Sequence, residues 1–126
     1  MEYVYLVIVL ALIEYFVFGA LVGRARGMYG VKAPACTGPE EFERAFRVQQ
    51  NTLEWLIVFI PAMWICGTYV GPMVATGFGV IGIVGRAIYA RAYIKAPEKR
   101  GPGMMLSGIA NMGLLIGSLV GIIQAL

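Results

Sequence analysis

The sequence contains no histidine and no aspartate among its 126 residues, and only 13% of its residues are charged. Without histidine, a Ser-His-Asp or Cys-His catalytic centre and an imidazole-based metal site are both excluded. Without aspartate, an aspartate-based Mg²⁺ site is excluded as well. We therefore expect no metal. Any chemistry must use Arg, Lys, Glu, Tyr or Ser side chains, or a reactive group that a bound molecule brings.

Apolar residues make up 60% of the chain, whereas a soluble globular domain is about 45–50% apolar. Four stretches are apolar enough, and near enough to about 20 residues in length, to cross a bilayer as helices. They are residues 3–22, 53–70, 74–93 and 104–125. The sequence thus predicts an all-α fold, an integral-membrane four-helix bundle in which residues 1–126 form a single domain.

All ten basic residues lie around the first and third connections, and none lies near the termini or the second connection. They are Arg24, Arg26, Lys32, Arg44 and Arg47, then Arg86, Arg91, Lys95, Lys99 and Arg100. Because positive charge favours the cytoplasmic side, loops one and three are predicted to be cytoplasmic and both termini to lie opposite. The membrane would be a bacterial inner membrane or the endoplasmic reticulum. A net charge of +3 beside a bilayer reflects topology, so no nucleic acid partner is expected.

Turn-forming glycines and prolines occupy residues 23–41, and the helical pattern resumes at Phe42, well before the apolar stretch begins at Leu53. Since a helix rises 1.5 Å per residue, the second helix is expected to project roughly two or three turns out of the bilayer.

Two polar stripes interrupt the apolar helices near the basic side. The first stripe, on the second helix, has spacings of 3, 4 and 3 residues and comprises Arg44, Arg47, Asn51 and Glu54. The second stripe, on the third helix, comprises Arg86, Tyr89 and Tyr93. Such spacings place each set on one helix face, and Gln49 points nearly the opposite way. Snorkelling arginines and interfacial tyrosines are the structural alternative, but Asn51 and Glu54 are too short to snorkel.

Polar and charged groups at membrane depth usually mark function. Together the two stripes offer guanidinium groups, a carboxylate, amides and phenols. They therefore suit a small zwitterion whose carboxylates pair with arginines and whose amine pairs with Glu54. Glutathione is such a molecule, and it supplies its own nucleophile, because a thiol needs only a nearby cation to lower its pKa.

Three segments resemble the MAPEG family (membrane-associated proteins in eicosanoid and glutathione metabolism). They are FERAFRVQQNTLE at 42–54, GRAIYARAY at 85–93 followed by PEKR at 97–100, and VGRAR at 22–26 with the glycine-rich connection after it. Within the family the likeness is strongest to the microsomal glutathione transferases, type three in particular, and to cysteinyl-leukotriene synthase.

The resemblance implies a homotrimer with glutathione, the co-substrate, held between neighbouring subunits. One subunit would bind it through Arg47, Asn51, Glu54, Tyr89 and Tyr93, and the adjacent subunit through Arg26 and Gln49. Arg100 would stabilise the thiolate as the catalytic residue. The implied function is a membrane glutathione transferase that conjugates glutathione to lipophilic electrophiles in detoxification, with lipid-hydroperoxide peroxidase activity as a further reaction.

The sequence departs from the family pattern at several points: relatives have the helix-two proline about one turn before Pro61, and the aspartate of prostaglandin E synthases is missing. Gly27 stands where leukotriene synthases have a second arginine, and Trp55 replaces a tyrosine that often follows the glutamate. Two alternatives stay open. A small proton-coupled multidrug transporter would use Glu14, which lies in the middle of the first apolar stretch. A non-catalytic, lipid-binding scaffold would have lost the glutathione-binding residues.

Overall fold

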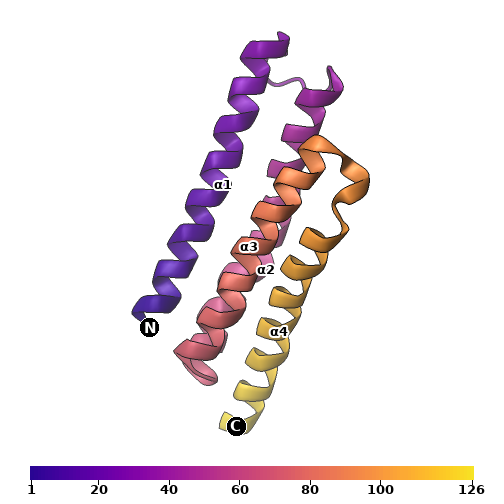
Figure 1. Ribbon diagram of the computed structural model, residues 1–126. Coiled ribbons are helices and arrows are strands. Elements are labelled where there is room, and N and C mark those ends of the chain that lie inside the picture. Colours follow the sequence, from indigo (N-terminus) through magenta and orange to yellow (C-terminus); the bar gives the residue numbers. More distant parts are fainter.

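The computed structural model describes all 126 residues. The chain forms four long α-helices and one short 3-10 helix, and it has no strands (Figure 1). The helices are α1 (Glu2–Tyr29), α2 (Glu40–Tyr69), α3 (Pro72–Lys95) and α4 (Gly101–Ala125), and the 3-10 helix η1 (Pro97–Lys99) precedes α4. All four α-helices are long and apolar enough to cross a membrane. The predicted all-α, four-helix architecture is therefore confirmed.

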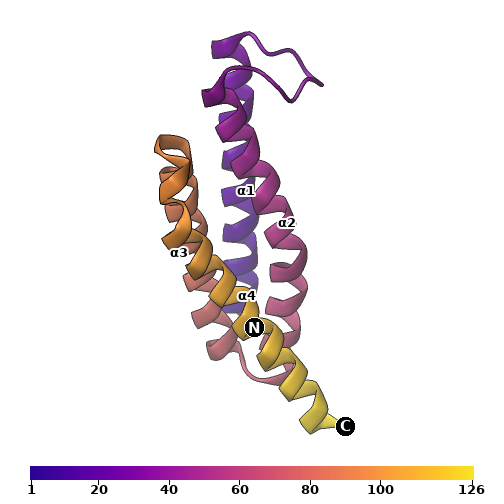
Figure 2. The ribbon, with the colours of Figure 1, turned by 90° about the vertical axis from the view of Figure 1, so that its right-hand side faces the viewer.

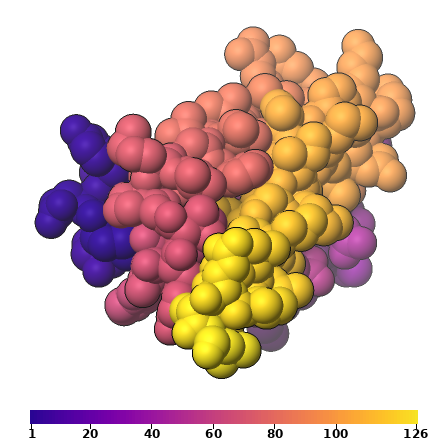
Figure 3. Space-filling model, turned by 90° about the horizontal axis from the view of Figure 1, so that it is seen from below, coloured from indigo at the N-terminus to yellow at the C-terminus, as the bar shows by residue number.

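Helices α2 and α3 form the middle of the bundle, and each of them contacts all three other α-helices. Helices α1 and α4 lie at opposite edges (Figure 1). Both termini lie at the same end as the α2–α3 turn, and the view onto this end shows the three segments together (Figure 3). The α1–α2 connection and η1 lie at the other end, which gathers the basic residues there.

Helix α1 is longer than the glycine pattern suggested, because it continues through Gly23 and Gly27 to Tyr29. The expectation of turn structure from residue 23 is wrong. A glycine inside a helix costs about 1 kcal/mol relative to alanine, and packing offsets this. Val22 and Ala25 on this last part of α1 are buried in a small apolar cluster with Val31, Phe42 and Ala45. The helix ends only at Gly30, whose φ of 69° is left-handed.

Helix α2 begins at Glu40, before the part that is apolar enough for a membrane, and with α1 it extends beyond α3 and α4 (Figure 2). Its first turn contains Glu40, Glu41 and Glu43, which the helix dipole favours at this end. The Glu43 carboxylate also accepts a hydrogen bond of 3.1 Å from the Gly38 amide. Helix α2 therefore begins well before its apolar part, as the helical pattern predicted.

Large apolar side chains cover the outside of the bundle, and the main core cluster combines small, aliphatic and aromatic residues. The glycines Gly113 and Gly121 of α4 pack against Phe78 and Tyr69, because small residues let membrane helices approach closely. Gly103 makes the closest approach to another backbone, because a Cβ there would lie 2.3 Å from the Tyr89 backbone nitrogen. The start of α4 therefore rests directly on the α3 backbone.

Candidate functional site

The buried guanidinium of Arg86 organises the polar centre of the bundle. Its Nη2 donates hydrogen bonds of 2.8 Å both to Asn51 Oδ1 and to Thr52 Oγ1 of α2. Its Nη1 lies 3.5 Å from Ser107 Oγ of α4. The guanidinium also lies 4.3 Å from the centre of the Tyr89 ring, a cation–π distance. Arg86 thus ties α2 and α4 to α3, and its side chain is only 1% exposed.

The contact with Arg86 orients the amide of Asn51. An arginine donates hydrogen bonds and cannot accept them, so the carbonyl oxygen of Asn51 must face it. The amide nitrogen of Asn51 then remains free to donate to a ligand. Arg86 belongs to the predicted third-helix stripe, but sequence reasoning did not place it among the site residues. Its position inside the bundle depends on partners from two other helices, which lie between 21 and 35 residues away in the sequence.

A hollow of about 300 Å³ opens beside this centre, between α2, α3 and α4. The expected binding residues Asn51 and Glu54 line it, and Ser107 and Asn111 of α4 line it from the other side. The Asn111 amide donates to the Trp55 carbonyl at 3.3 Å, while its Oδ1 is buried and has no partner. Sequence reasoning did not include Ser107 and Asn111, although polar side chains are rare on this apolar helix.

Trp55 is buried, and its role in the structure is internal. Its indole nitrogen donates a hydrogen bond of 2.9 Å to the Ser107 carbonyl, and its ring stacks on Phe59 at 4.2 Å. A tyrosine at this position would offer a hydroxyl group to a ligand. Trp55 instead holds α4 against α2.

A second, more polar hollow of about 330 Å³ lies toward the loop end and is lined by Arg47 and Tyr93, with Pro97 at its edge. Arg44 also lines it, but Arg44 forms an ion pair with Glu40 and donates to the Ile94 carbonyl at 3.2 Å. Arg47 has no such partner within the chain and is exposed. Of the two arginines in the second-helix stripe, Arg47 is thus the one available to an anionic ligand.

The expected thiolate-stabilising residue, Arg100, is exposed just before α4 and donates a hydrogen bond of 2.9 Å to the Pro97 carbonyl. It therefore stands next to the residue that edges the second hollow. Tyr89 is buried, and its ring centre lies 5.6 Å from that of half-buried Tyr93. The structure brings Arg47, Tyr93 and Arg100 to the loop end of one surface, with Asn51 and Glu54 deeper along it.

The other two expected residues lie elsewhere in this chain. Gln49 lines a hollow on the α1 side together with Tyr15, Phe16 and Gly19, so it faces away from the Arg47 surface, as the helical spacing predicted. Arg26 donates to the Ala35 carbonyl at 2.8 Å and lies 5.0 Å from the centre of the Phe42 ring. A single chain therefore holds the expected residues on two separate surfaces.

Glu14 is half-buried on α1, and its Oε1 atom is buried without a hydrogen-bond partner. It forms no ion pair with a basic residue of the chain. The chain holds no group of three or more cysteines or glutamates that could bind a metal ion.

Comparison with known proteins adds independent information. Residues 4–120 match the sequence model of the MAPEG family. An uncharacterized protein of Synechocystis sp. is 44% identical over 121 residues, which cover 96% of this chain and 88% of that protein. Human microsomal glutathione S-transferase 2 is 44% identical over 103 residues, 81% of this chain and 70% of the enzyme. Leukotriene C4 synthase of Cavia porcellus is 31% identical over 106 residues, 78% of this chain and 71% of the enzyme.

Proposed function

Because the chain belongs to the MAPEG family and is an integral, multi-pass membrane protein, we propose that it is a membrane glutathione transferase. The observation that carries the proposal is the polar surface shared by α2, α3 and the start of α4. It places Arg47, Tyr93 and Arg100 beside Asn51 and Glu54 on a bundle whose outside is mostly apolar. The glutathione transferase and leukotriene C4 synthase among its relatives favour this reading over a Glu14-dependent transporter.

The side chains on this surface fit the charges of glutathione. Arg47 is free to pair with a carboxylate, and the exposed carboxylate of Glu54 can accept hydrogen bonds from the ammonium group. Asn51, oriented by Arg86, presents its amide nitrogen to a backbone carbonyl of the peptide. Each of the three ligand groups thus meets a side chain of complementary chemistry.

Glutathione has two carboxylates, and Arg47 can pair with only one of them. A neighbouring subunit would provide Arg26 as the partner of the second carboxylate, and its Gln49 would contact the peptide from the same side. We infer a homotrimer in which the α1 side of one subunit covers the Arg47 surface of the next. The loop end that carries both surfaces would face the cytoplasm, where glutathione is abundant.

Arg100 performs the chemical step by stabilising negative charge on sulfur. Its guanidinium favours the thiolate, and the thiol proton leaves to solvent. The sulfur then attacks a lipophilic electrophile that arrives from the bilayer. A carbon–sulfur bond forms as the bond to the leaving group breaks. The product is a glutathione thioether.

A lipid hydroperoxide would react at the same sulfur. The thiolate attacks the terminal oxygen, the oxygen–oxygen bond breaks, and the lipid alkoxide takes a proton to become an alcohol. A second glutathione converts the resulting sulfenic acid to the disulfide and releases water. No aspartate is present for prostaglandin E synthesis, and Gly27 stands where leukotriene synthases of the family have a second arginine. The proposed substrates are therefore lipophilic xenobiotic electrophiles and lipid hydroperoxides.

The direct test is the ultraviolet absorbance of the glutathione thiolate on mixing with the purified protein. The wild type is expected to show it. Arg100→Ala should lose it while still binding glutathione, and Arg100→Lys should keep part of it. Arg24→Ala, at an exposed arginine on the same end, is the matched control and should behave as the wild type. Equal thiolate signals from wild type and Arg100→Ala would overturn the assignment of Arg100.

A further inference from the structure

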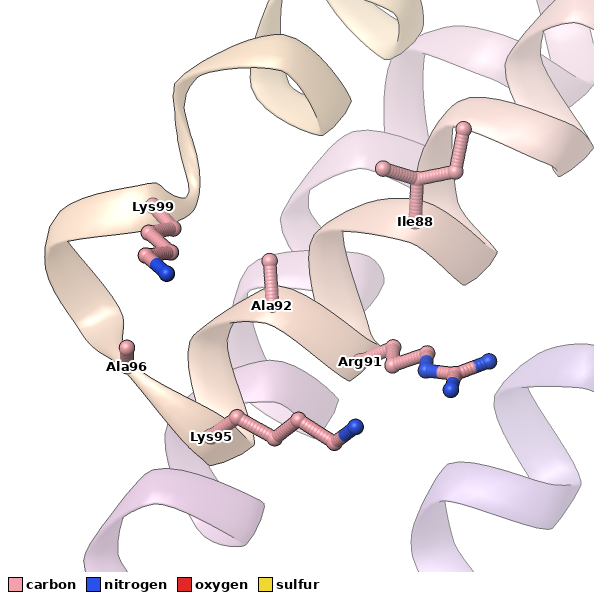
Figure 4. A pocket seen from close by; sticks show the side chains of 6 residues that line it. All are labelled: Ile88, Arg91, Ala92, Lys95, Ala96 and Lys99. Carbon is pink, nitrogen blue, oxygen red and sulfur yellow. The ribbon is translucent and has the colours of Figure 1, made fainter.

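A third hollow of about 300 Å³ lies on the face of α3 that points away from the Tyr89 and Tyr93 stripe. Three basic side chains and three apolar ones line it (Figure 4). The basic ones are Arg91, Lys95 and Lys99, and the apolar ones are Ile88, Ala92 and Ala96. None of these residues belongs to the proposed glutathione site.

The three cations at this hollow have no acidic partner. The two ion pairs of the chain join the N-terminal amine with Glu2 and Arg44 with Glu40, and Glu98 pairs with neither neighbouring lysine. The protein itself engages several other arginines of this end: Arg44 with Glu40, Arg86 with Asn51 and Arg100 with the Pro97 carbonyl. Three like charges around one hollow repel one another, and an anion placed among them removes that repulsion.

The face of α3 below the cations is apolar and outward-facing. Ile81, Val84 and Ile88 follow one another at helical spacing, and each is between 38% and 47% exposed. The ten residues from Ile81 to Arg91 rise about 15 Å along the helix. This equals about half of the 30 Å hydrocarbon core, the depth of one lipid leaflet. Because Ile81 lies near the middle of α3, the face changes from apolar to cationic about one leaflet's depth from the middle of the helix.

We propose that this hollow is a binding site for an anionic phospholipid. Its phosphate lies among Arg91, Lys95 and Lys99, and its acyl chains run along Ile88, Val84 and Ile81. The small side chains of Ala92 and Ala96 leave the space that the headgroup fills. A free phosphate ion would use the same cations but would gain nothing from the apolar face. The match of depth and polarity therefore selects a lipid.

Native mass spectrometry of the protein in an uncharged detergent tests this, with phosphatidylglycerol and phosphatidylcholine added at equal concentrations. The wild type should retain phosphatidylglycerol preferentially. Each basic residue at an anionic surface contributes about 1 kcal/mol, so Arg91→Gln with Lys95→Gln should weaken the binding on the order of 25-fold. Ala92→Leu fills the hollow and keeps every charge, and it should also abolish the preference.

Two controls separate a site from general attraction to a basic surface. Arg24→Gln with Lys32→Gln removes two exposed charges from the same end and should leave the preference intact. Excess inorganic phosphate should not displace the lipid. Equal retention of the two lipids by the wild type would overturn the proposal. So would an equal loss in the two double variants, an unchanged preference in Ala92→Leu, or displacement of the lipid by inorganic phosphate.

Discussion

Four arginines near the loop end illustrate how residues of one type acquire different roles. Arg86 is buried and bound by side chains of α2 and α4, Arg44 is paired with Glu40, and Arg100 touches the Pro97 carbonyl. Arg47 alone of the four is free of such contacts and is exposed on the proposed glutathione surface. Helical spacing predicted that Arg44 and Arg47 share one face of the second helix and that Arg86 belongs to the polar stripe of the third. It did not predict that Arg86 would be bound inside the bundle or that Arg44 would contact the Ile94 carbonyl, because those partners come from other helices.

Replacing Arg86 tests its role as a positioning residue. Arg86→Leu leaves the Asn51 and Thr52 oxygens without their donor, and each unsatisfied buried polar group costs about 1–3 kcal/mol. We expect a lower Tm and a raised KM for glutathione, because Asn51 loses its orientation. Arg86→Lys keeps the charge but not the paired donors, so it should recover Tm better than KM.

Thermal unfolding in detergent and steady-state kinetics measure the two effects. Arg24→Lys, at an exposed and uninvolved arginine, is the control for charge-preserving change. If Arg86→Leu lowers Tm and leaves KM for glutathione at the wild-type value, Arg86 is structural only and does not position Asn51.

Among the elements, α4 depends most closely on its neighbour. Its start lies on the α3 backbone at Gly103. Ser107 accepts hydrogen bonds from Trp55 and Arg86, and Asn111 donates one to the Trp55 carbonyl. The sequence predicted the extent of α4 well, from residue 104 against Gly101 in the structure. It predicted the end of α1 less well, because glycines at residues 23 and 27 favour a turn in the sequence. The burial of Val22 and Ala25 against α2, which keeps this part helical, is visible only in the structure.

Gly103→Ala should separate α3 from α4 at the loop end. The added Cβ would lie 2.3 Å from the Tyr89 nitrogen and 2.5 Å from its Cα, and backbone atoms cannot move aside as a flexible side chain can. Overpacking of this kind costs about 1–3 kcal/mol. We expect a lower Tm and weaker glutathione binding, measured by calorimetric titration.

Gly108→Ala is the matched control, because nothing lies within 4 Å of a Cβ at this exposed position of the same helix. It should raise Tm slightly, since alanine favours a helix over glycine. A Gly103→Ala protein with wild-type Tm would show that the close contact does not constrain the bundle.

At the scale of the whole molecule, the division of the expected residues between two surfaces is the main finding. Residue spacing alone predicted that Gln49 and Arg47 face opposite ways, and the structure agrees. The sequence could not predict how two chains meet, since that depends on the complete outer shape of the bundle. It identified the number of helices and their approximate spans because a membrane-crossing helix has a fixed apolar length.

Mixing two inactive variants tests whether the surfaces meet between subunits. Arg47→Ala removes the binding surface, and Arg26→Ala removes the contribution from the neighbour. In a trimer that contains both variants, one interface in three combines an intact surface from each variant, so activity should return to about a third of the wild type.

Co-expression with two different tags, followed by tandem purification and a conjugation assay, measures the recovery. Mixing Arg47→Ala with Glu54→Ala is the control, because both changes affect the same surface and every interface stays defective. A mixture of Arg47→Ala and Arg26→Ala that stays as inactive as either parent would show that the site is not shared.

Both chain ends lie at the end of the bundle opposite the proposed glutathione surface (Figure 1). The carboxyl end of one copy can therefore be joined to the amino end of another by a flexible linker without crossing the membrane. Three copies in one polypeptide would then have a fixed order around the assembly. A substitution could be placed in a single chosen copy, and the number of working sites could be set one at a time.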